Sequence, residues 1–516
     1  MNDRTFPLSV LAAWGVLLAA VTVACVALAG GQLIYTLDDP YIHLAVAETI
    51  LGGGYGVNAG EYASPSSSIL WPWLMAGTEA MGLGMAGPLV VNVLAAGATV
   101  LLACRFLVKN GAAGEGRLGR FLAGLVVVLL TSAVALPLTG MEHSLHVLLT
   151  VAAVDGLVDV AERRRMPWYL VPALAFLPLV RFEGVALAGA GIVLLLLFRR
   201  WGAAVATALA SLAGLSLYGA FAAAHGLPFF PSSVLLKSDA VSTGSGAAML
   251  LDAAANLMTR AGLCLLLSAL LLLFLAAVQR RAHPRMALVY LAGAGVVAAH
   301  LLAGRIGWFF RYEVYCAALA GLLLFQAFAL FVRQGRKPPL RPVFLSALLG
   351  VMAVDYALAA VASPFAARNV YEQQYQMRRF AQDFYRAPVA VNDLGLVSYG
   401  NPAYVLDLWG LGSEAVRTLR AAHRYDAAAM ARLTRESHVG LVMIYDDWFP
   451  ALPPEWTPVA TLTTTDNYVA GGARVTFLAT PDADLPALRA ALENFAGTLP
   501  ARVEFRLETA ENAPST

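Results

Sequence analysis

Two adjacent acids, Asp38 and Asp39, directly follow the first long apolar run of the chain. That run covers residues 8–34 and is long enough to cross a bilayer. Acidic side chains at a membrane surface are not needed to hold a span in place, so a pair of them at the mouth of a hydrophobic bundle is a candidate for chemistry at the interface. We therefore expect at least one of the two carboxylates to be catalytic or to bind a ligand.

A helix start offers a structural explanation for one of the two acids. The dipeptide Asp39-Pro40 is typical of a helix N-terminus, with Asp39 as N-cap and Pro40 at the first helical position. We expect that helix to run to about Leu51 along the membrane surface, which leaves Asp38 unexplained. His43 follows Asp39 by four residues and therefore lies on the same helix face, where it could support the site or bind a metal with the acids.

Several cations lie on the side of the membrane that the positive-inside rule leaves poor in Lys and Arg. They are Arg181, Lys237, Arg260, Arg305 and Arg311. Arginine gives bidentate contacts to phosphate and lysine gives a point charge, so a phosphate at the lipid headgroup level would be a suitable partner. The alternatives are attraction to anionic headgroups and pairing with Glu183 or Glu313.

The loop after the acid pair is rich in glycine and in polar groups. Three consecutive glycines, residues 52–54, break the short helix, and no Lys-Ser/Thr follows, so this is not a phosphate loop. Glu61 and the serines after it could hydrogen-bond a polyhydroxyl ligand, or they could cap the re-entry of the chain into the membrane. Aromatic residues on the same side are expected to form an interfacial belt, with stacking on a sugar ring as the alternative. They are Trp71, Trp73, Phe229, Phe230, Trp308, Phe309 and Tyr312.

Composition identifies the solvent of most of the chain as lipid. The 516 residues are 59% hydrophobic and only 13% charged, against roughly 25% charged in soluble domains. The net charge of +2 is too close to zero to indicate a nucleic-acid partner. Apolar runs give about eleven candidate spans. They lie near residues 8–34, 85–108, 120–138, 143–160, 167–180, 184–198, 202–224, 260–279, 286–304, 313–332 and 342–363.

The loop charges set an expected orientation. Lys and Arg are concentrated in the short loops on the side of the N-terminus, as in residues 163–165, which predicts a cytoplasmic N-terminus. An odd number of spans then places everything after about Ser363 outside. Asp355, inside the last span, is a functional candidate by default or a partner for a neighbouring helix.

The tail of the chain is more polar and predicts a separate domain. We expect a membrane domain over residues 1–363 and an extracytoplasmic α/β domain over residues 364–516. Strands are expected at residues 389–391, 404–406 and 439–445, with one helix over 414–436 between the last two. The predicted fold is thus an α-helical polytopic membrane protein with a C-terminal soluble α/β domain.

Taken together, these motifs resemble those of the GT-C superfamily of integral membrane glycosyltransferases, which use polyprenyl-phosphate sugar donors. Within it the chain is most similar to the bacterial terminal β-(1→2) arabinofuranosyltransferases of mycobacterial type. The resemblance covers most of the chain, and the acid pair is its most specific element. The motifs that carry it are the acid pair with Tyr41-Ile42-His43, the loop Asn58…Glu61…Ser64-Pro65, Gly140-Met141-Glu142, Arg181-Phe182-Glu183, Pro231-Ser232-Ser233…Lys237, Arg311-Tyr312, Asn392-Asp393-Leu394-Gly395 and Asp407-Leu408-Trp409-Gly410-Leu411.

The resemblance implies a mechanism and a set of site residues. The donor's lipid would lie between spans, with its phosphate held by Lys237, Arg311, Arg181 and Arg305. Asp38 or Asp39 would be the general base on an acceptor hydroxyl or would stabilise positive charge at the anomeric carbon. Further substrate-binding residues would be His43, Asn58, Glu61, Ser64, Glu142, His143, Glu183 and Tyr312.

The same resemblance implies the partners and the location. The sugar, with arabinofuranose as the expectation, would pass to a cell-envelope glycan or glycoprotein on the outer face of the bacterial inner membrane, with the tail domain helping to bind this acceptor. A divalent cation is compatible with the residues but not required by them, and no other cofactor is expected.

A rival interpretation is a transporter or flippase of a lipid-linked or anionic substrate. That class would favour charged or Gly/Pro-broken segments near the bilayer centre, often in two matching halves. Here the polar residues cluster at one mouth of the bundle and no halves match. A non-catalytic scaffold would leave the acid pair and the outside cations without a role.

Overall fold

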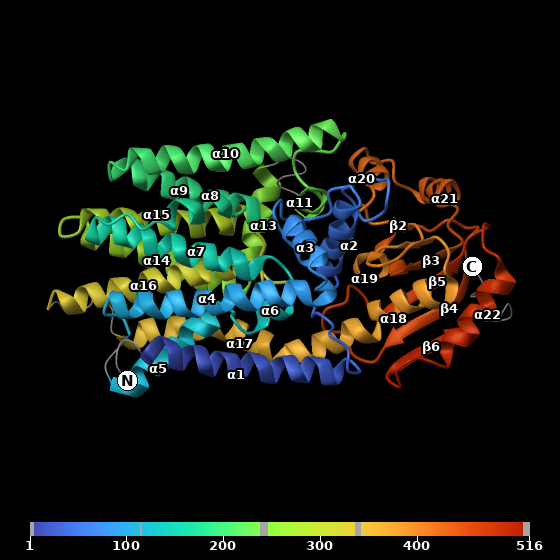
Figure 1. The fold of residues 1–516 in the computed structure, drawn as a ribbon, viewed down its shortest axis with the longest axis horizontal. Helices are drawn as coiled ribbons and strands as arrows, with labels where there is room; N and C mark the ends of the chain where they lie inside the picture. Colours follow the sequence, from blue (N-terminus) through green and yellow to red (C-terminus); the bar gives the residue numbers. More distant parts are fainter. Residues whose placement is uncertain (1–4, 114–115, 238–245, 336–341, 509–516) are drawn as a thin grey trace.

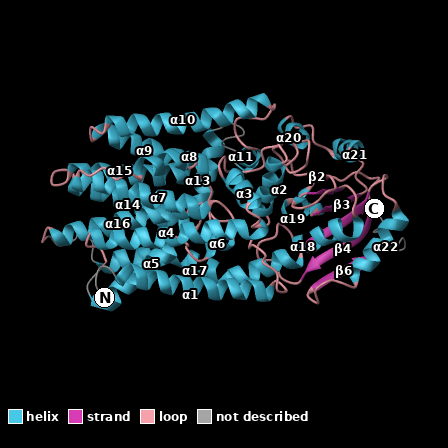
Figure 2. Ribbon diagram, viewed as in Figure 1, coloured by secondary structure: helices cyan, strands magenta, loops and turns pink. Residues whose placement is uncertain are grey.

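The computed structural model describes residues 5–113, 116–237, 246–335 and 342–508. Long helices run side by side through most of the molecule, and a smaller domain that contains a β-sheet lies at one end of them (Figure 1). Helices dominate everywhere except in this end domain, where the strands gather (Figure 2). We call the end of the helix bundle next to the sheet the domain-facing end.

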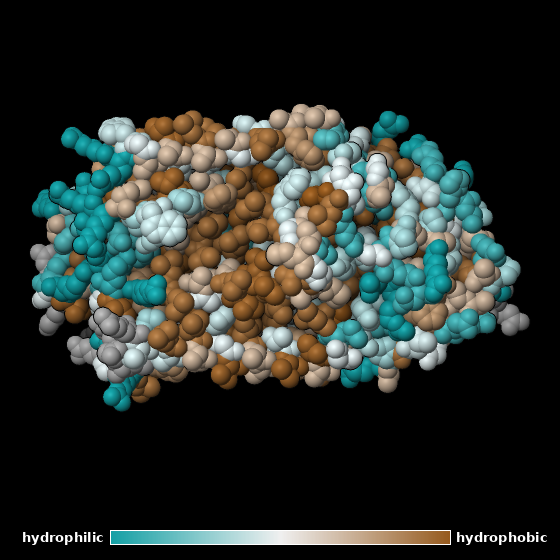
Figure 3. All heavy atoms as spheres, viewed as in Figure 1, coloured by the Kyte–Doolittle hydropathy of each residue, from teal (hydrophilic) through white to brown (hydrophobic). Residues whose placement is uncertain are grey.

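Among the described residues, nine helical segments are long and apolar enough to cross a membrane. They are built from α1 (Thr5–Leu28), α4 (Gly87–Lys109), α5 (Gly116–Leu130) with α6 (Ala135–Leu138), α7 (His143–Val158) with η2 (Asp159–Arg163), α10 (Trp201–Ala224), α14 (Arg260–Gln279), α15 (Pro284–Ala303), α16 (Val314–Arg333) and α17 (Pro342–Glu372). Two shorter apolar helices, α8 (Leu170–Val180) and α9 (Gly184–Leu197), match the remaining two predicted spans. A broad apolar surface separates hydrophilic surfaces at the two ends (Figure 3), so the prediction of a multi-pass helical membrane protein is confirmed.

Short elements fill the domain-facing end. They are α2 (Asp39–Leu51), α3 (Trp71–Ala80), η1 (Gly84–Ala86), α11 (Ser232–Lys237) and α13 (Gly246–Leu257). The capping hypothesis for Asp39 is wrong, because α2 begins at Asp39 and its N-cap position is Asp38, with no side-chain cap hydrogen bond. Residues 40–47 of α2 are buried, since the helix packs against α3 and against α19 (Gly395–Ser398) of the C-terminal domain. It is therefore a core element of the junction between the bundle and the sheet domain.

The C-terminal domain is an α/β domain with one six-stranded sheet, as the strand and helix alternation predicted. The strand order is β2-β1-β3-β5-β4-β6, and β1 pairs in parallel with β2 and β3 whereas the remaining pairs are antiparallel. The strands are β1 (Val389–Val391), β2 (Val405–Asp407), β3 (Leu441–Ile444), β4 (Thr457–Thr464), β5 (Arg474–Ala479) and β6 (Val503–Leu507). The other elements are α18 (Gln374–Arg379), η3 (Phe380–Tyr385), α19, α20 (Glu414–Ala421), α21 (Ala427–Glu436), η4 (Asp446–Trp448) and α22 (Leu485–Ala496).

Two details of the tail differ from the prediction. The single helix expected over residues 414–436 is two helices, because His423 takes a left-handed φ of 53° and Asp426 then caps a new helix through Ala429 N–H. The position predicted as the domain boundary, 363/364, lies inside α17, which continues from the bundle to Glu372.

The two domains are joined by polar contacts between loops of the bundle and backbone groups of the sheet domain. The Asn58 amide donates to Val405 O (2.9 Å) and accepts from Val405 N–H (3.0 Å). Since β2 is the edge strand of the sheet, Asn58 satisfies the backbone groups that an edge leaves open. Glu61 accepts from the Tyr404 hydroxyl (2.7 Å) and Glu48 from Gly400 N–H (2.9 Å), so the same loop region is fixed at further points.

We predict that Asn58→Ala weakens the junction of the two domains. The change leaves both backbone groups of Val405 without their side-chain partner, which costs about 1–3 kcal/mol per unsatisfied buried group. Limited proteolysis and thermal unfolding of the purified protein should show faster cleavage in the C-terminal domain and a lower Tm. Asn401→Ala is the control, because the Asn401 side chain bonds to Val397 O and Ala403 N–H, both within the C-terminal domain. Equal proteolysis of the two variants would contradict this role of Asn58.

Candidate active site

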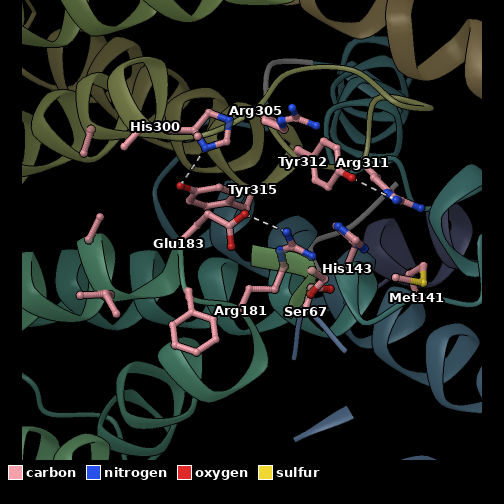
Figure 4. Close-up of a pocket in the computed structure, with 17 residues that line it drawn as sticks. Ser67, Met141, His143, Arg181, Glu183, His300, Arg305, Arg311, Tyr312 and Tyr315 are labelled. Atoms are coloured by element: carbon pink, nitrogen blue, oxygen red, sulfur yellow. Dashed lines mark hydrogen bonds and ion pairs between the residues drawn. The ribbon is translucent and has the colours of Figure 1, made fainter. Parts of the chain in front are cut away.

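A cavity of about 380 Å³ opens at the domain-facing end of the bundle, and its lining combines cations, acids and aromatic rings (Figure 4). Its walls come from the turn between α8 and α9, the start of α7, the last turn of α15, the first turn of α16 and the loop between α15 and α16. Six of the predicted site residues line it, namely Arg181, His143, Glu183, Arg305, Arg311 and Tyr312. The structure therefore brings together residues that are up to 169 positions apart in the sequence.

Arg311 is the best-placed anion-binding group in this cavity. Its side chain is 1% exposed, and its Nη2 donates to Asp39 Oδ2 and to the Tyr312 hydroxyl, the latter at 3.1 Å. Its Nε and Nη1 are buried and have no hydrogen-bond partner among the described residues. Burial opposes the charge, but the neighbouring Tyr312 and Asp39 outweigh it and raise the pKa of Arg311. The guanidinium therefore stays charged and keeps donors for a ligand.

Arg181 is already balanced by two carboxylates. Its Nη1 donates to Glu142 Oε1 (2.5 Å) and its Nη2 to Glu183 Oε1 (2.7 Å). Burial disfavours each charge, yet the Arg181 guanidinium lowers the pKa of Glu183 to about 2, and the Glu183 and Glu142 carboxylates raise the pKa of Arg181. Glu142 is further fixed by Ser67 Oγ–H (2.9 Å) and lies 3.8 Å from His43 Nε2. Arg181 thus shapes the cavity, with Nε as the donor that has no partner among the described residues.

Arg305 and Lys237 complete the predicted phosphate-binding set. Arg305 is exposed at the cavity wall and makes no ion pair with any described residue. It therefore offers a cation that no acid in the described part of the chain neutralises. Lys237 is the last residue of α11, but its side chain lies outside the described residues.

The far wall of the cavity contains residues that the sequence analysis did not select. His300 and Tyr315 face each other there, with His300 Nδ1 and the Tyr315 hydroxyl 3.3 Å apart (Figure 4). His146 packs against the same Tyr315 ring in a tilted arrangement, with 4.5 Å between ring centroids. All three lie in or at the ends of predicted spans, and a histidine inside an apolar span is the signal that would have identified this wall.

An apolar groove continues from the cavity along the bundle. It measures about 400 Å³ and runs between α9 and α15. Ala186 and Ala299 line both the groove and the polar cavity, so the two spaces adjoin. All other groove residues are alanine, glycine, valine or leucine: Ala190, Val193, Leu194, Leu197, Leu288, Leu291, Ala292, Gly295 and Val296. This combination of a charged head and an apolar extension is what an anionic lipid requires.

The two adjacent acids have different partners. Asp39 pairs with Arg311 and keeps 23% of its side chain exposed. Asp38 is buried and accepts Gly395 N–H at Oδ2 (2.6 Å) and Leu396 N–H at Oδ1 (2.8 Å). Burial and the nearby Asp393 carboxyl raise the pKa of Asp38 well above its usual range. Asp38 therefore connects the bundle to the sheet domain, and Asp39 is the acid that reaches the cavity through Arg311.

Three predicted ligand-binding residues lie elsewhere. Asn58 and Glu61 contact the sheet domain, as described above. Ser64 is buried, and its hydroxyl lies 2.7 Å from that of Tyr218 on α10, while its carbonyl accepts from Ser232 N–H at the start of α11.

Asp355, the intramembrane acid, pairs with Arg260. Among the residues that the structure describes, no group of three or more His, Cys, Asp or Glu side chains is arranged to hold a metal ion.

Comparison with known protein families gives one match. A family defined as a domain of unknown function, DUF8728, matches residues 368–478, which extend from the end of α17 to β5. This segment contains Asn392–Gly395 and Asp407–Leu411, the two tail motifs noted in the sequence. No curated protein matches the chain.

Three solved structures match most of this chain at low sequence identity. ArnT from Cupriavidus metallidurans, bound to undecaprenyl phosphate, is 14% identical with a TM-score of 0.44 over 91% of this chain and 99% of that one. The mycobacterial arabinofuranosyltransferase AftD is 16% identical with a TM-score of 0.42 over 93% of this chain and 42% of that one. The Archaeoglobus fulgidus oligosaccharyltransferase, in its apo form, is 12% identical with a TM-score of 0.43 over 90% and 74% of the two chains.

A buried acid beside the cavity predicts a pH dependence of stability. Glu313 precedes α16, is fully buried and accepts Gly307 N–H at 3.0 Å, and burial raises its pKa from 4.5 to about 7. Between those two pH values the native protein binds more protons at Glu313 than the unfolded protein does, so its contribution to stability falls as pH rises.

Thermal unfolding in lipid nanodiscs from pH 4.5 to 7.5 checks this prediction. Wild type should lose more of its Tm over this range than Glu313→Gln, whose neutral amide can still accept from Gly307 N–H. Glu493→Gln, which changes an exposed glutamate on α22 in the same way, serves as control. Parallel pH profiles for wild type and Glu313→Gln would show that Glu313 does not titrate in this range.

Proposed function

We propose that this protein is a membrane glycosyltransferase that takes a sugar from a polyprenyl-phosphate donor and transfers it to a hydroxyl of an acceptor outside the bilayer. The observation that carries the proposal is Arg311, a buried guanidinium whose Nε and Nη1 have no partner among the described residues, in a cavity that adjoins an apolar groove. A phosphate ester fits the guanidinium, and an isoprenoid chain fits the groove between α9 and α15. The resemblance of the sequence motifs to the GT-C superfamily supports the same function.

The cations would act on the leaving phosphate. During transfer the bond between the anomeric carbon and the phosphate oxygen breaks, and its electron pair goes to the phosphate. Donors that are fixed before the reaction stabilise this growing charge most effectively, because they need no reorganisation. Arg311 is fixed by Asp39 and Tyr312, while the exposed Arg305 of the same loop offers a second cation to the phosphate.

Asp39 is the acid that we assign to the acceptor side. The acceptor oxygen forms the new bond to the anomeric carbon, and Asp39 takes the proton of that hydroxyl. Its pairing with Arg311 places the base beside the phosphate-binding group. One ion pair therefore contains both the base for the acceptor hydroxyl and the cation for the leaving phosphate. Asp38 cannot exchange its two backbone hydrogen bonds for a substrate without loosening the sheet domain, so we assign it a positioning role.

Our proposals for the sugar, the acceptor and the location rest on the sequence resemblance. Arabinofuranose is therefore the first sugar to test. The acceptor that the resemblance supports is a cell-envelope glycan or glycoprotein. The resemblance also supports a bacterial inner membrane location with the N-terminus in the cytoplasm and the C-terminal domain outside.

Sugar transfer itself is the first test. Purified protein is incubated with a panel of polyprenyl-phosphate sugars and a membrane glycan extract, and released polyprenyl phosphate is measured. We expect release from at least one donor, and we expect Asp39→Asn to lower it by about 10²–10⁴-fold, the usual contribution of a general base. Asp38→Asn should lower Tm more than Asp39→Asn does. Full turnover by Asp39→Asn would remove the proposed base, and no release from any donor would refute the function.

Arg305 gives a test of donor binding that leaves folding intact. Because Arg305 is exposed and pairs with no described acid, Arg305→Ala should keep the wild-type Tm. We expect polyprenyl phosphate to bind about tenfold more weakly, since a charge-assisted hydrogen bond contributes about 1.5–3 kcal/mol. Binding of the radiolabelled lipid in nanodiscs measures the effect. The matched control is Arg281→Ala, which changes an exposed cation in the turn between α14 and α15. Unchanged lipid affinity in Arg305→Ala would exclude this residue from the phosphate site.

A further inference from the structure

A second, smaller pocket lies between the bundle and the sheet domain. It measures about 200 Å³ and is lined by Leu37, Trp308 and Phe309 on the bundle side and by residues 467–470 on the side of the sheet domain. This volume is below the range of about 300–1,000 Å³ that drug-sized ligands occupy, so it suits a single ring-sized group. Trp308 and Tyr468 are 54% and 49% exposed, so both aromatic rings remain available for contact.

The bundle side of this pocket has an unusual backbone. Trp308, Phe309 and Phe310 all take left-handed conformations, with φ of 45°, 65° and 54°. Such angles cost bulky residues of order 1–3 kcal/mol each, and they persist only where surrounding contacts hold them. Here Gly307 N–H bonds to Glu313 on one side of the run, and Arg311 pairs with Asp39 on the other. These contacts hold the strained loop and therefore fix where the Trp308 and Phe309 side chains lie.

The opposite wall is fixed as well. The Asn369 side-chain oxygen accepts the backbone N–H groups of Tyr468, Val469 and Ala470, at 3.0, 3.0 and 3.1 Å. Asn369 is buried on α17, the helix that leaves the bundle, so this turn of the sheet domain is held directly by the membrane domain. Tyr468 also stacks on Phe365 of the same helix, with 5.4 Å between ring centroids. Both walls of the pocket are thus preorganised.

The pocket adjoins the ion pair that the proposed reaction uses. Leu37 is two residues from Asp39, which limits the distance between their Cα atoms to about 7 Å. Trp308 and Phe309 belong to the same short loop as Arg311. Arg311 and Tyr312 of that loop line the donor cavity, whereas Trp308 and Phe309 line the second pocket. One loop therefore contributes to two separate spaces, and it also carries Arg311, the partner of Asp39.

We propose that the second pocket binds the sugar unit of the acceptor whose hydroxyl is glycosylated. This inference rests on the proposed function and names the acceptor subsite of the same active site. Exposed aromatic faces next to an amide side chain, Asn467, present both the apolar surface and the hydrogen-bonding groups that a saccharide ring needs. The sheet domain supplies one wall, so it takes part in acceptor recognition.

Saccharide and donor binding are measured separately on the full-length protein in nanodiscs. The saccharide probes are methyl α-arabinofuranoside, methyl α-mannopyranoside and their di- and trisaccharides, titrated by saturation-transfer NMR. The donor probe is radiolabelled polyprenyl phosphate. The variants are Trp308→Leu, Tyr468→Leu and Asn369→Ala, and the control is Trp168→Leu, since Trp168 is an 85% exposed tryptophan at the start of α8, far from the pocket in the chain.

We expect wild type and Trp168→Leu to bind at least one saccharide with equal affinity. Loss of an aromatic anchor should weaken that binding about tenfold or more in Trp308→Leu and Tyr468→Leu. Polyprenyl phosphate affinity should stay within about twofold of wild type. Asn369→Ala should weaken saccharide binding without changing either aromatic ring, and its folding is checked by Tm.

The alternative outcomes are distinct. Equal saccharide affinity in wild type, Trp308→Leu and Tyr468→Leu, or no saccharide binding by wild type, overturns the acceptor pocket. Weaker polyprenyl phosphate binding in Trp308→Leu with unchanged saccharide binding also overturns it, because the pocket would then belong to the donor. Saccharide binding that depends on Trp308, in a protein that binds no polyprenyl phosphate, refutes the proposed donor and leaves the saccharide pocket standing.

Discussion

The ion pair between Asp39 and Arg311 is the contact on which the arrangement of the site depends. It joins the start of α2 to the loop between α15 and α16, across 272 positions of sequence. A carboxylate that pairs with one edge of a guanidinium orients the whole planar group, and the remaining donors of Arg311 then have a fixed direction. Because the pair is almost entirely removed from water on the arginine side, breaking it would leave a buried charge, which is far more costly than losing an exposed pair.

The neighbouring carboxylate shows how one short motif can serve two purposes. Successive residues at a helix start project in directions about 100° apart, so Asp38 and Asp39 cannot reach the same partner. Asp38 holds the backbone of Gly395 and Leu396, and a Cβ on Gly395 would lie 2.1 Å from the Asp38 carbonyl oxygen. The glycine in the Asn392–Gly395 motif is therefore required by this close approach. Two consecutive residues therefore have different roles: Asp38 holds the sheet domain, and Asp39 is the proposed base.

Charge balance explains why the arginines of the cavity are not equivalent. Arg181 has two carboxylate partners, Arg311 has one, and Arg305 has none among the described residues. An anionic phosphate would therefore be drawn to Arg311 and Arg305, whereas Arg181 maintains the shape of the wall. The adjoining apolar groove between α9 and α15 accounts for the other half of such a ligand.

The sequence by itself determined the membrane-spanning architecture. In lipid every backbone polar group must be satisfied within a helix, so about 20 apolar residues specify a span with little help from other parts of the chain. It also predicted that acids and cations gather at one end, and that the tail contains strands such as Val389–Val391. The tertiary structure alone decided the partners: that Asp39 meets Arg311, that Asn58 and Glu61 bind the sheet domain, and that His300 and Tyr315 form a cavity wall. Hydrophobicity along the chain is a local property that the order of residues records, whereas an ion pair or a pocket depends on distances between segments far apart in the chain, which only packing fixes.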